Sequence, residues 1–401
     1  MDALIDVVLN QKNGSDEKEK FPAVLVNNDN RNEKIGEPIE FEGHTKFTFP
    51  GRNKKYSEFV WNWQCFSGVD ANDENGYRIY KILNEYGDDW SDAPDDENGN
   101  YDYLLGADIE FRNPHVRDEI KAWAKWYFEL TGFHGVRMDA VKHISTTFMN
   151  EFLDYLKTFN ETNFAMGEFW TPDVDKLSNY VEQTGGRMQL LDAPLHYKFY
   201  EAGQKGKDFD LRELLNDTLV ERNPFYSITF VDNHDTQPLQ ALESPVEEWF
   251  KPMAYAYIML RENGIPCISY FAMYGATYEA HDKEGNLQKI ELKPVEYLEQ
   301  FLMMRKNVAY GLQRDYFDHN NTVGWTREGT DEHPHALAVI ITNSDEGFKE
   351  MEVGVKHAGK IFYDALGNRP DKVTIDENGK AFFTANAGSV SVYIPEGCPI
   401  C

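Results

Sequence analysis

Three short apolar runs in this chain each end in an acidic residue, and this pattern constrains the fold more than any other feature. The runs are 135–139, 164–168 and 227–235, and they end at Asp139, Glu168 and Asp235. In the first run apolar and charged residues alternate, as in a short strand with one polar face. Acids at the carboxyl ends of several parallel strands meet on one face of a (β/α)8 barrel. The pattern therefore predicts such a barrel, with three carboxylates gathered at one end.

Arg137 lies two positions before Asp139, on the same face of the predicted strand. Taken alone, these two residues are equally well explained by a buried ion pair that only holds the fold together. The two later runs that end in acids favour a functional site.

Helical periodicity alternates with these runs. Asn113-Pro114 is typical of a helix start, Val116, Ile120 and Trp123 repeat at three- and four-residue steps, and Gly132 is typical of a helix end. Further helices are expected at 146–159, 174–184, 211–222, 246–262 and 295–307, with strands at 187–191 and 266–270. The repeated strand–helix order predicts parallel strands with helices outside, the α/β class.

Two regions break this alternation. Residues 11–112 lack a helical period and are rich in Asn, Asp, Gly and aromatic residues, which predicts an irregular β-rich insertion that forms a domain rather than a loop. After Gly311 the period becomes two, with turn signals, which predicts an antiparallel β-sandwich. The expected domains are an incomplete barrel at 1–10 and 113–311, the insertion at 11–112, and a carboxy-terminal sandwich at 312–401.

Composition restricts the possible partners. The chain has 401 residues and a formal net charge of -28, which argues against nucleic acid and anionic membrane surfaces because a polyanion would be repelled. It has no apolar run of about 18 residues, so no transmembrane helix is expected. The start of the chain lacks the features of a secretory signal, which predicts a cytoplasmic protein, or a secreted one if a leader has been removed.

The three runs, together with Leu4–Asn10, resemble the conserved regions of the α-amylase family of glycoside hydrolases (family 13), in particular its liquefying bacterial members. In the first region the family pattern is D-V-V-x-N-H. This chain has Asp6-Val7-Val8-Leu9-Asn10, followed by Gln11 in place of the histidine. The resemblance implies that Gln11 faces the sugar at the cleavage subsite, where an amide can donate a hydrogen bond.

This first region resembles the third strand of the family barrel, yet only a few residues precede it. Two strand–helix units, on the order of 60 residues at about 30 each, have no counterpart. The resemblance therefore implies a (β/α)8-type TIM barrel truncated at its amino end. A monomer is expected unless another chain fills the place of the missing strands.

By the same resemblance, Asp139 is the nucleophile, Glu168 the general acid/base and Asp235 the acid that stabilises the transition state of a retaining glycosidase. Arg137 would keep Asp139 ionised. The aromatic residues after Glu168 would raise its pKa and keep it protonated.

The resemblance also implies a set of substrate contacts. His234 would bind hydroxyl groups at the cleavage subsite, and Lys142 and His143 would contact the sugars on the leaving side. Trp170 would offer a stacking face. Each of these residues taken alone is more often structural.

A structural Ca²⁺ between the insertion and the barrel is implied as well. Its ligands would be Asn10, Asp102, Asp108 and the carbonyl of His143, and Asp89 is a weaker candidate for a neighbouring metal. Hard oxygen ligands of this kind are those that Ca²⁺ selects.

The implied function is endo-acting hydrolysis of α-1,4-glucosidic bonds in starch, glycogen or maltodextrins. Two alternatives stay open. One is a transglycosylase of the same family, and the other is an inactive α-glucan-binding remnant, which the missing strands and Gln11 favour.

Overall fold

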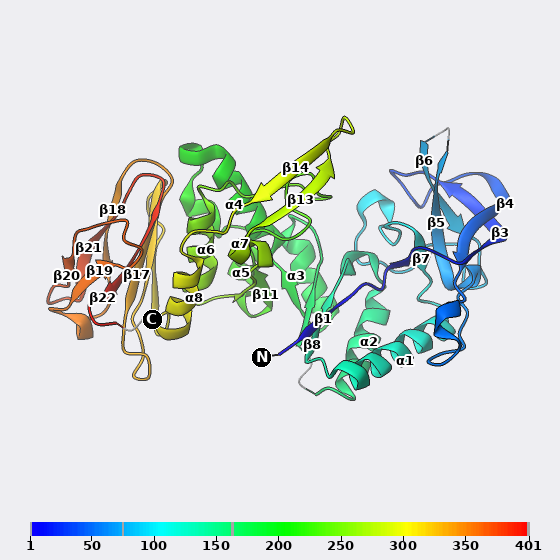
Figure 1. Ribbon diagram of the computed structural model, residues 1–401, viewed down its shortest axis with the longest axis horizontal. Coiled ribbons are helices and arrows are strands. Elements are labelled where there is room, and N and C mark those ends of the chain that lie inside the picture. Colours follow the sequence, from blue (N-terminus) through cyan, green and yellow to red (C-terminus); the bar gives the residue numbers. More distant parts are fainter. Residues whose placement is uncertain (1, 74–75, 162–163, 399–401) are drawn as a thin grey trace. The chain divides into compact units, whose positions relative to one another are not determined.

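The computed structural model describes residues 2–73, 76–161 and 164–398. The chain divides into two compact units (Figure 1). The first contains residues 1–171 and 175–191, and the second contains residues 172–174 and 192–401.

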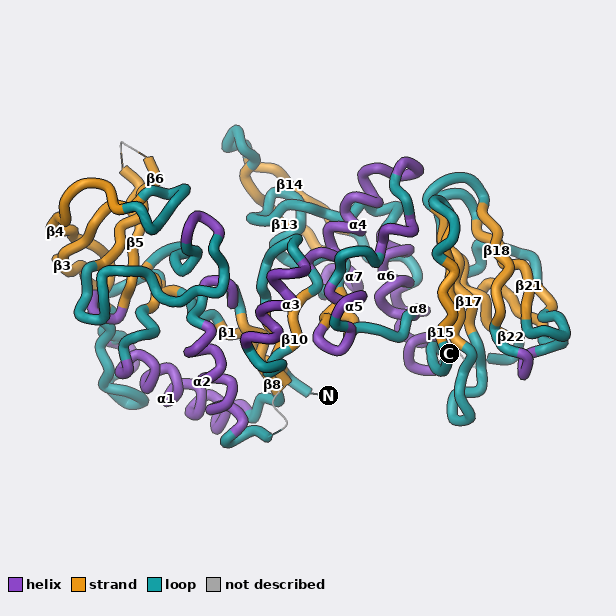
Figure 2. The backbone as a smooth tube through the Cα atoms, turned by 180° about the vertical axis from the view of Figure 1, so that it is seen from behind, coloured by secondary structure: helices purple, strands orange, loops and turns teal. Residues whose placement is uncertain are grey.

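Parallel strands form the centre of the first unit. They are β1 (Leu4–Val7), β8 (Gly135–Met138), β9 (Phe164–Gly167) and β10 (Gln189–Leu191), paired in that order. The helices that follow them are α1 (Pro114–Thr131), α2 (Thr146–Lys157) and α3 (Val174–Gln183), and α1 and α2 lie side by side in both views (Figures 1 and 2). This part of the fold confirms the predicted strand–helix alternation.

The ends of α1 follow from local chemistry. The side chain of Asn113 accepts a hydrogen bond from the His115 N–H, and Pro114 occupies the first turn. Gly132 adopts φ 61° and donates its N–H to the Phe128 carbonyl at 2.7 Å. The predicted start and end of this helix are confirmed.

The insertion forms one antiparallel sheet. No α-helix occurs among its described residues. Its strands are β2 (Gln11–Lys12), β3 (Glu17–Val26), β4 (Lys34–Lys46), β5 (Phe66–Asp73), β6 (Gly76–Ile82) and β7 (Ala107–Ile109), in the order β2-β7-β5-β6-β3-β4. Because β2 pairs with β7, Gln11 lies opposite Asp108. The predicted β-rich insertion is confirmed.

The second unit contains the parallel pair β11 (Ser227–Thr229) and β12 (Ile265–Pro266) and the hairpin β13 (Ala276–His281) with β14 (Leu287–Leu292). Its helices are α4 (Ala193–Lys205), α5 (Leu219–Arg222), α6 (Lys251–Leu260), α7 (Tyr270–Tyr274) and α8 (Leu298–Asn307).

Helix α4 and the hairpin were not predicted, and one predicted helix of this unit is not a single element. The helix expected at 211–222 is split into a 3-10 turn at Leu211–Leu214 and α5, because Asp217 adopts the left-handed φ of 57° and Thr218 caps a new helix.

The carboxy-terminal part is antiparallel, as predicted. Its strands are β15 (Gln313–Tyr316), β16 (Thr322–Arg327), β17 (Leu337–Thr342), β18 (Gly347–Glu352), β19 (Ile361–Asp364), β20 (Val373–Thr374), β21 (Lys380–Ala385) and β22 (Val390–Pro395). They form a six-stranded sheet, β15-β16-β17-β22-β19-β20, and the pair β18-β21. Trp325 is fully buried against α6, and its indole N–H donates to the Leu260 carbonyl at 3.3 Å. Among the described residues, no helix has the length and apolar character needed to cross a membrane.

Candidate active site

One guanidinium group links three carboxylates in the first unit. Nη1 of Arg137 lies 2.6 Å from Oδ1 of Asp139 and 2.7 Å from Oδ1 of Asp6, and Nη2 lies 2.7 Å from Oε2 of Glu168. The Arg137 side chain is 14% exposed and that of Glu168 is 7% exposed. At such burial, charged groups need partners, and these four groups supply them to one another.

Strand register explains this convergence. Asp6 of β1 lies beside Arg137 of β8, and residues 137 and 138 lie beside 166 and 167 of β9. Asp139 then donates its backbone N–H to the Val7 carbonyl at 3.0 Å, and Glu168 donates its own to the Met138 carbonyl at 2.9 Å. Both acids are therefore fixed by backbone hydrogen bonds immediately after their strands.

The electrostatics of the group depend on Arg137. Burial acts to lower the pKa of Arg137, but the carboxylates of Glu168, Asp6 and Asp139 outweigh it and raise the pKa above its ordinary value. The guanidinium is therefore permanently charged and compensates part of the negative charge around it. The sequence predicted a partnership with Asp139 alone, whereas the structure shows Arg137 shared with Glu168 and Asp6.

Asp6 was not among the predicted site residues. Its signal in the sequence is a single acid inside the apolar run Leu4–Leu9. Arg137 of the adjacent strand pairs with Asp6, whose side chain is 60% exposed, so it is the mostly buried Arg137 rather than Asp6 that needs this partner.

His234 and Asp235 belong to the second unit. The Asn233 side-chain oxygen accepts the backbone N–H groups of Asp235 at 2.9 Å and Thr236 at 3.0 Å, and this local turn holds the segment. Nε2 of His234 lies 3.3 Å from Oδ2 of Asp235. The His234 side chain is 65% exposed and open to a ligand.

Two predicted substrate contacts, Lys142 and His143, also contact the insertion. Nζ of Lys142 lies 3.1 Å from Oε2 of Glu97 and 3.6 Å from Oδ2 of Asp95. His143 is buried, with Nδ1 2.6 Å from the Tyr101 carbonyl, so Nδ1 carries the proton because a carbonyl can only accept. Burial lowers the pKa of His143 to about 3, so the ring is neutral.

The two remaining predicted contacts lie in different settings. Trp170 is half-buried, two residues after Glu168. Gln11 lies on β2, and its side-chain oxygen is buried with no hydrogen-bond partner among the described residues.

Three of the predicted calcium ligands meet in the first unit. Asn10, Asp102 and Asp108 are each 1% exposed, and Nδ2 of Asn10 lies 3.3 Å from Oδ1 of Asp108. Ser91 donates a hydrogen bond to Asp102, and Ser67 donates one to Asp108. These hydroxyls satisfy only part of the hydrogen-bonding capacity of two carboxylates.

The donor set fits a hard cation. Burial raises the pKa of Asp102 to about 6, and burial together with the charge of Asp102 raises that of Asp108 well above its ordinary value. The side-chain oxygen of Asn10 is buried with no hydrogen-bond partner among the described residues. Two repelling carboxylates and a free amide oxygen match the oxygen ligands that Ca²⁺ prefers.

No group of three or more His, Cys, Asp or Glu side chains suited to a metal occurs in the described part of the chain. A site at Asn10, Asp102 and Asp108 would thus need carbonyl oxygens or water in addition. The weaker candidate, Asp89, has a side chain that is 94% exposed and lies 4.0 Å from Lys34.

Comparison with known proteins adds independent information. Residues 84–328 match the family described as "Alpha amylase, catalytic domain", and residues 337–394 match "Alpha-amylase C-terminal". The first match covers more than half of the chain.

Individual relatives match nearly the whole chain. The cytoplasmic α-amylase of Escherichia coli is 46% identical over 398 residues, which cover 98% of this chain and 80% of the relative. The α-amylase of Bacillus licheniformis is 43% identical over 393 residues, covering 97% of this chain and 75% of the relative.

Solved structures show the same fold at lower identity. The α-amylase from Geobacillus thermoleovorans, crystallised with acarbose, aligns with a TM-score of 0.58 at 22% identity, covering 75% of this chain and 67% of that chain. An Anoxybacillus α-amylase aligns with a TM-score of 0.56 at 21% identity, covering 72% and 65%.

Proposed function

The chain belongs to the α-amylase family of glycoside hydrolases, and from this premise we propose that Asp139, Glu168 and Asp235 hydrolyse internal α-1,4-glucan bonds here. The observation that supports the proposal most strongly is the position of the Arg137 guanidinium between the two acids. Its Nη1 lies 2.6 Å from Oδ1 of Asp139, and its Nη2 lies 2.7 Å from Oε2 of Glu168. A single cation that contacts both acids keeps them within reach of one glycosidic bond.

The proposed mechanism is a double displacement. In the first step an oxygen of Asp139 bonds to the anomeric carbon, the glycosidic carbon–oxygen bond breaks, and the proton of Glu168 passes to the leaving oxygen. In the second step a water oxygen bonds to the same carbon, its proton passes to Glu168, and the carboxylate of Asp139 is released. The first step leaves Glu168 as the carboxylate that accepts the proton of water, and the second step restores both residues to their starting states.

Residues around the acids would bind and orient the sugar. His234, which is exposed beside Asp235, would donate hydrogen bonds to hydroxyl groups at the cleaved unit. Asp235 would stabilise the positive charge that develops on the sugar ring. Trp170 would stack on a ring near Glu168.

Asn10, Asp102 and Asp108 would hold a Ca²⁺ ion, whose charge would offset the repulsion between the two buried carboxylates. The role proposed for this ion is structural. The family, the donor chemistry and the buried Asn10 oxygen support it.

The proposal extends to substrate and location. Starch, glycogen and maltodextrins are the expected substrates, because their uncharged α-glucan chains are compatible with a strongly acidic protein. A cytoplasmic location is supported by the 46% identity to an E. coli protein named as cytoplasmic α-amylase.

One assay tests the reaction. The purified chain, supplied with calcium, is offered soluble starch and a blocked maltoheptaoside, and new reducing ends are measured. Asp139→Asn and Glu168→Gln should each lower kcat by at least about 10³-fold, since each removes a group that reacts. Glu129→Gln, at an exposed position of α1, is the matched control and should retain full activity.

The same assay separates the alternatives. A cyclomaltodextrin glucanotransferase is 25% identical over 81% of this chain, which keeps transglycosylation as a second candidate. Products longer than the substrate would identify that activity. Saccharide binding with no mutant-sensitive turnover would contradict the enzyme proposal and support a glucan-binding remnant.

A further inference from the structure

The segment that carries Asp235 turns back on itself between residues 231 and 246. The backbone N–H of Leu242 donates to the Asp235 carbonyl at 3.0 Å, and the backbone N–H of Ser244 donates to the Thr236 carbonyl, also at 3.0 Å. The returning part of the segment therefore sets the position of the Asp235 backbone, and Ser244 lies at its end.

A buried histidine of α4 contacts both ends of this segment. Nδ1 of His196 lies 2.6 Å from the Val231 carbonyl, and Nε2 lies 2.9 Å from Oγ of Ser244. His196 and Val231 are fully buried, and Ser244 is 4% exposed. The ring also stacks on Phe230, with 5.4 Å between the ring centres and 5° between the planes. One imidazole therefore joins the start of the segment to its end.

The protons in these contacts can be assigned. A carbonyl can only accept, so Nδ1 of His196 carries the proton that is donated to Val231. Burial lowers the pKa of His196 to about 4, so the ring is neutral at neutral pH and Nε2 is an acceptor. The single hydroxyl proton of Ser244 is shared between Nε2 and the Leu242 carbonyl, which lies 2.7 Å from Oγ. Both ring nitrogens are in use, and this fixes the orientation of the ring between the two ends.

A second buried side chain joins the same two ends. Oδ1 of Asp232 accepts the Val246 N–H at 3.1 Å, and Oδ2 lies 3.5 Å from Nζ of Lys251 at the start of α6. The side chains of Asp232 and Lys251 are 3% and 6% exposed. The Ser269 hydroxyl donates to the Asp232 carbonyl. The strand end before Asp235 is thus anchored, and His196 is the link between this anchored end and the returning part.

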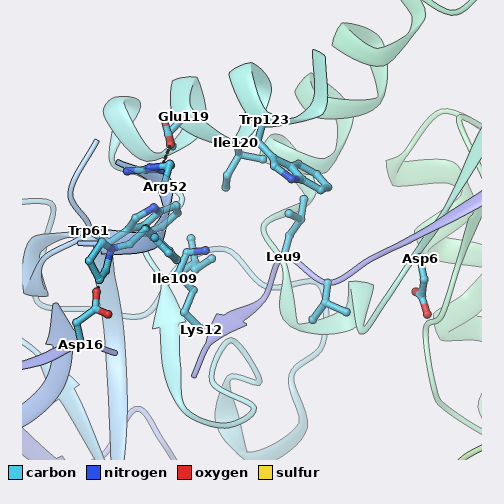
Figure 3. Close-up of a pocket in the computed structure, with 14 residues that line it drawn as sticks. Asp6, Leu9, Lys12, Asp16, Arg52, Trp61, Ile109, Glu119, Ile120 and Trp123 are labelled. Atoms are coloured by element: carbon cyan, nitrogen blue, oxygen red, sulfur yellow. Dashed lines mark hydrogen bonds and ion pairs between the residues drawn. The ribbon is translucent and has the colours of Figure 1, made fainter. Parts of the chain in front are cut away.

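Support of this kind distinguishes Asp235 from Asp6 of the first unit. Asp6 is held directly by Arg137 at 2.7 Å, although its side chain is 60% exposed at the border of a cavity of about 770 Å³ (Figure 3). The side chain of Asp235 lies 3.3 Å from that of His234, which is itself 65% exposed. An exposed partner fixes a side chain poorly, so the position of Asp235 depends on its backbone contacts and, through Ser244, on the buried ring.

We propose that His196 is a positioning residue for Asp235 and acts through Ser244. This inference rests on the proposed function, in which Asp235 stabilises the positive charge that develops on the sugar. Because that charge is present in the transition state and not in the bound substrate, a displaced Asp235 should lower kcat and leave KM nearly unchanged. A histidine that only filled the core would affect stability alone.

Two variants test this role at a temperature at which both are folded. His196→Ala removes both contacts of the ring, and Ser244→Ala removes one hydroxyl. With a blocked maltoheptaoside as substrate, His196→Ala should lower kcat at least about tenfold and Ser244→Ala at least about threefold, each with KM within about twofold of the wild-type value. Because both variants interrupt the same contact, the double variant should be no slower than His196→Ala.

A conservative variant and a control separate positioning from stability. In His196→Gln an amide can still bond to Ser244, so this variant should recover part of the lost kcat. Thr218→Ala removes the cap of α5, where the hydroxyl bonds to Leu215 and Glu221. It should lower Tm in the same unit and leave kcat unchanged.

Amide hydrogen exchange gives a readout that does not use hydrolysis. The N–H groups of Leu242 and Ser244 are those that hold Asp235 and Thr236. In His196→Ala they should exchange at least about tenfold faster than in the wild-type chain, whereas exchange in β17 should not change.

Two results would overturn the proposal. One is a wild-type kcat in His196→Ala, even if the variant is less stable, and the other is unchanged exchange at Leu242 and Ser244. A wild-type chain that hydrolyses no glucan would instead contradict the proposed function and, with it, the catalytic part of this proposal. The exchange measurement would still decide whether His196 holds the segment.

Discussion

The guanidinium of Arg137 lies 2.7 Å from the carboxylate of Glu168, although the two residues are 31 positions apart in the chain. The same group contacts Asp139 and Asp6. One buried cation therefore sets the charge balance of both proposed reacting acids.

Arg137→Lys should lower kcat by about 10²-fold or more. A lysine keeps the charge but cannot donate to Asp139 and Glu168 in the fixed fork of a guanidinium, so the two carboxylates lose their common support. Steady-state kinetics on a blocked maltoheptaoside measures the effect. Arg187→Lys, which alters an exposed pair with Asp154, serves as control, and an equal loss in both variants would contradict the prediction.

Calcium removal should lower thermal stability. A ligand present at 100 times its Kd stabilises the native state by about 2.7 kcal/mol, and a chelator removes that contribution. Asp108→Asn should abolish the difference in Tm between calcium and chelator, because it removes one of the two buried carboxylates. Asp29→Asn, at an exposed position in the same insertion, should keep the full difference, and its loss there would point to a nonspecific effect.

Lys142→Met should lower the free energy of unfolding by about 1–3 kcal/mol, since it leaves the buried Asp95 and its neighbour Glu97 with less positive charge. Urea denaturation measures this difference. The exposed Lys34–Asp89 pair offers the control, because Lys34→Met should cost less than about 1 kcal/mol. A rise in KM for Lys142→Met with unchanged stability would instead favour the predicted sugar contact.

His196 should make the protein less stable in acid. Its ring is buried, with Nδ1 2.6 Å from the Val231 carbonyl, and burial lowers its pKa to about 4 from 6.5. Between these values the unfolded chain binds the proton more strongly, so the contribution of His196 to stability is present above pH 6.5. As the pH falls to 4, about 3 kcal/mol of that contribution is lost.

Unfolding in urea at several pH values, compared with His196→Gln, isolates this effect. In His196→Gln the free energy of unfolding should no longer show the loss between pH 6.5 and 4 that the histidine causes. His281→Gln, at an exposed position, should still show it. Identical pH profiles for the wild-type protein and His196→Gln would contradict the assignment.

The sequence predicted helices and strands correctly where neighbouring residues in the chain determine them. Helix α1 carries its own start and stop residues in Asn113, Pro114 and Gly132, and its limits were predicted correctly. The runs that became β8 and β9 were recognised because each ends in an acid that breaks an apolar pattern. Such signals depend only on neighbours in the chain.

Other features depend on contacts between distant residues. The pairing of Arg137 with Glu168 and Asp6 requires the register of three strands, which the spacing of residues does not reveal. The break at Asp217 carries no glycine or proline, and its local marks are only an aspartate, which tolerates the left-handed region, and the capping Thr218.

Helix α4 was missed although local signals exist. Asp192 caps it and Pro194 lies in its first turn. The Asp192 carboxylate also accepts the backbone N–H groups of Leu219 and Val220, at 3.1 Å and 2.7 Å, and these contacts across the unit cannot be inferred from sequence.

The pairing of β2 with β7 has a consequence for how this protein can vary. It joins the two ends of the insertion at Gln11 and Asp108, so the roughly one hundred residues between them form a loop whose ends are held together. The turn between Val26 and Lys34 is held as well, because Arg31 is buried there and its carbonyl accepts the indole N–H of Trp90 at 2.8 Å. A change in length at this turn would therefore disturb the packing of Trp90, although the two ends of the insertion would stay joined.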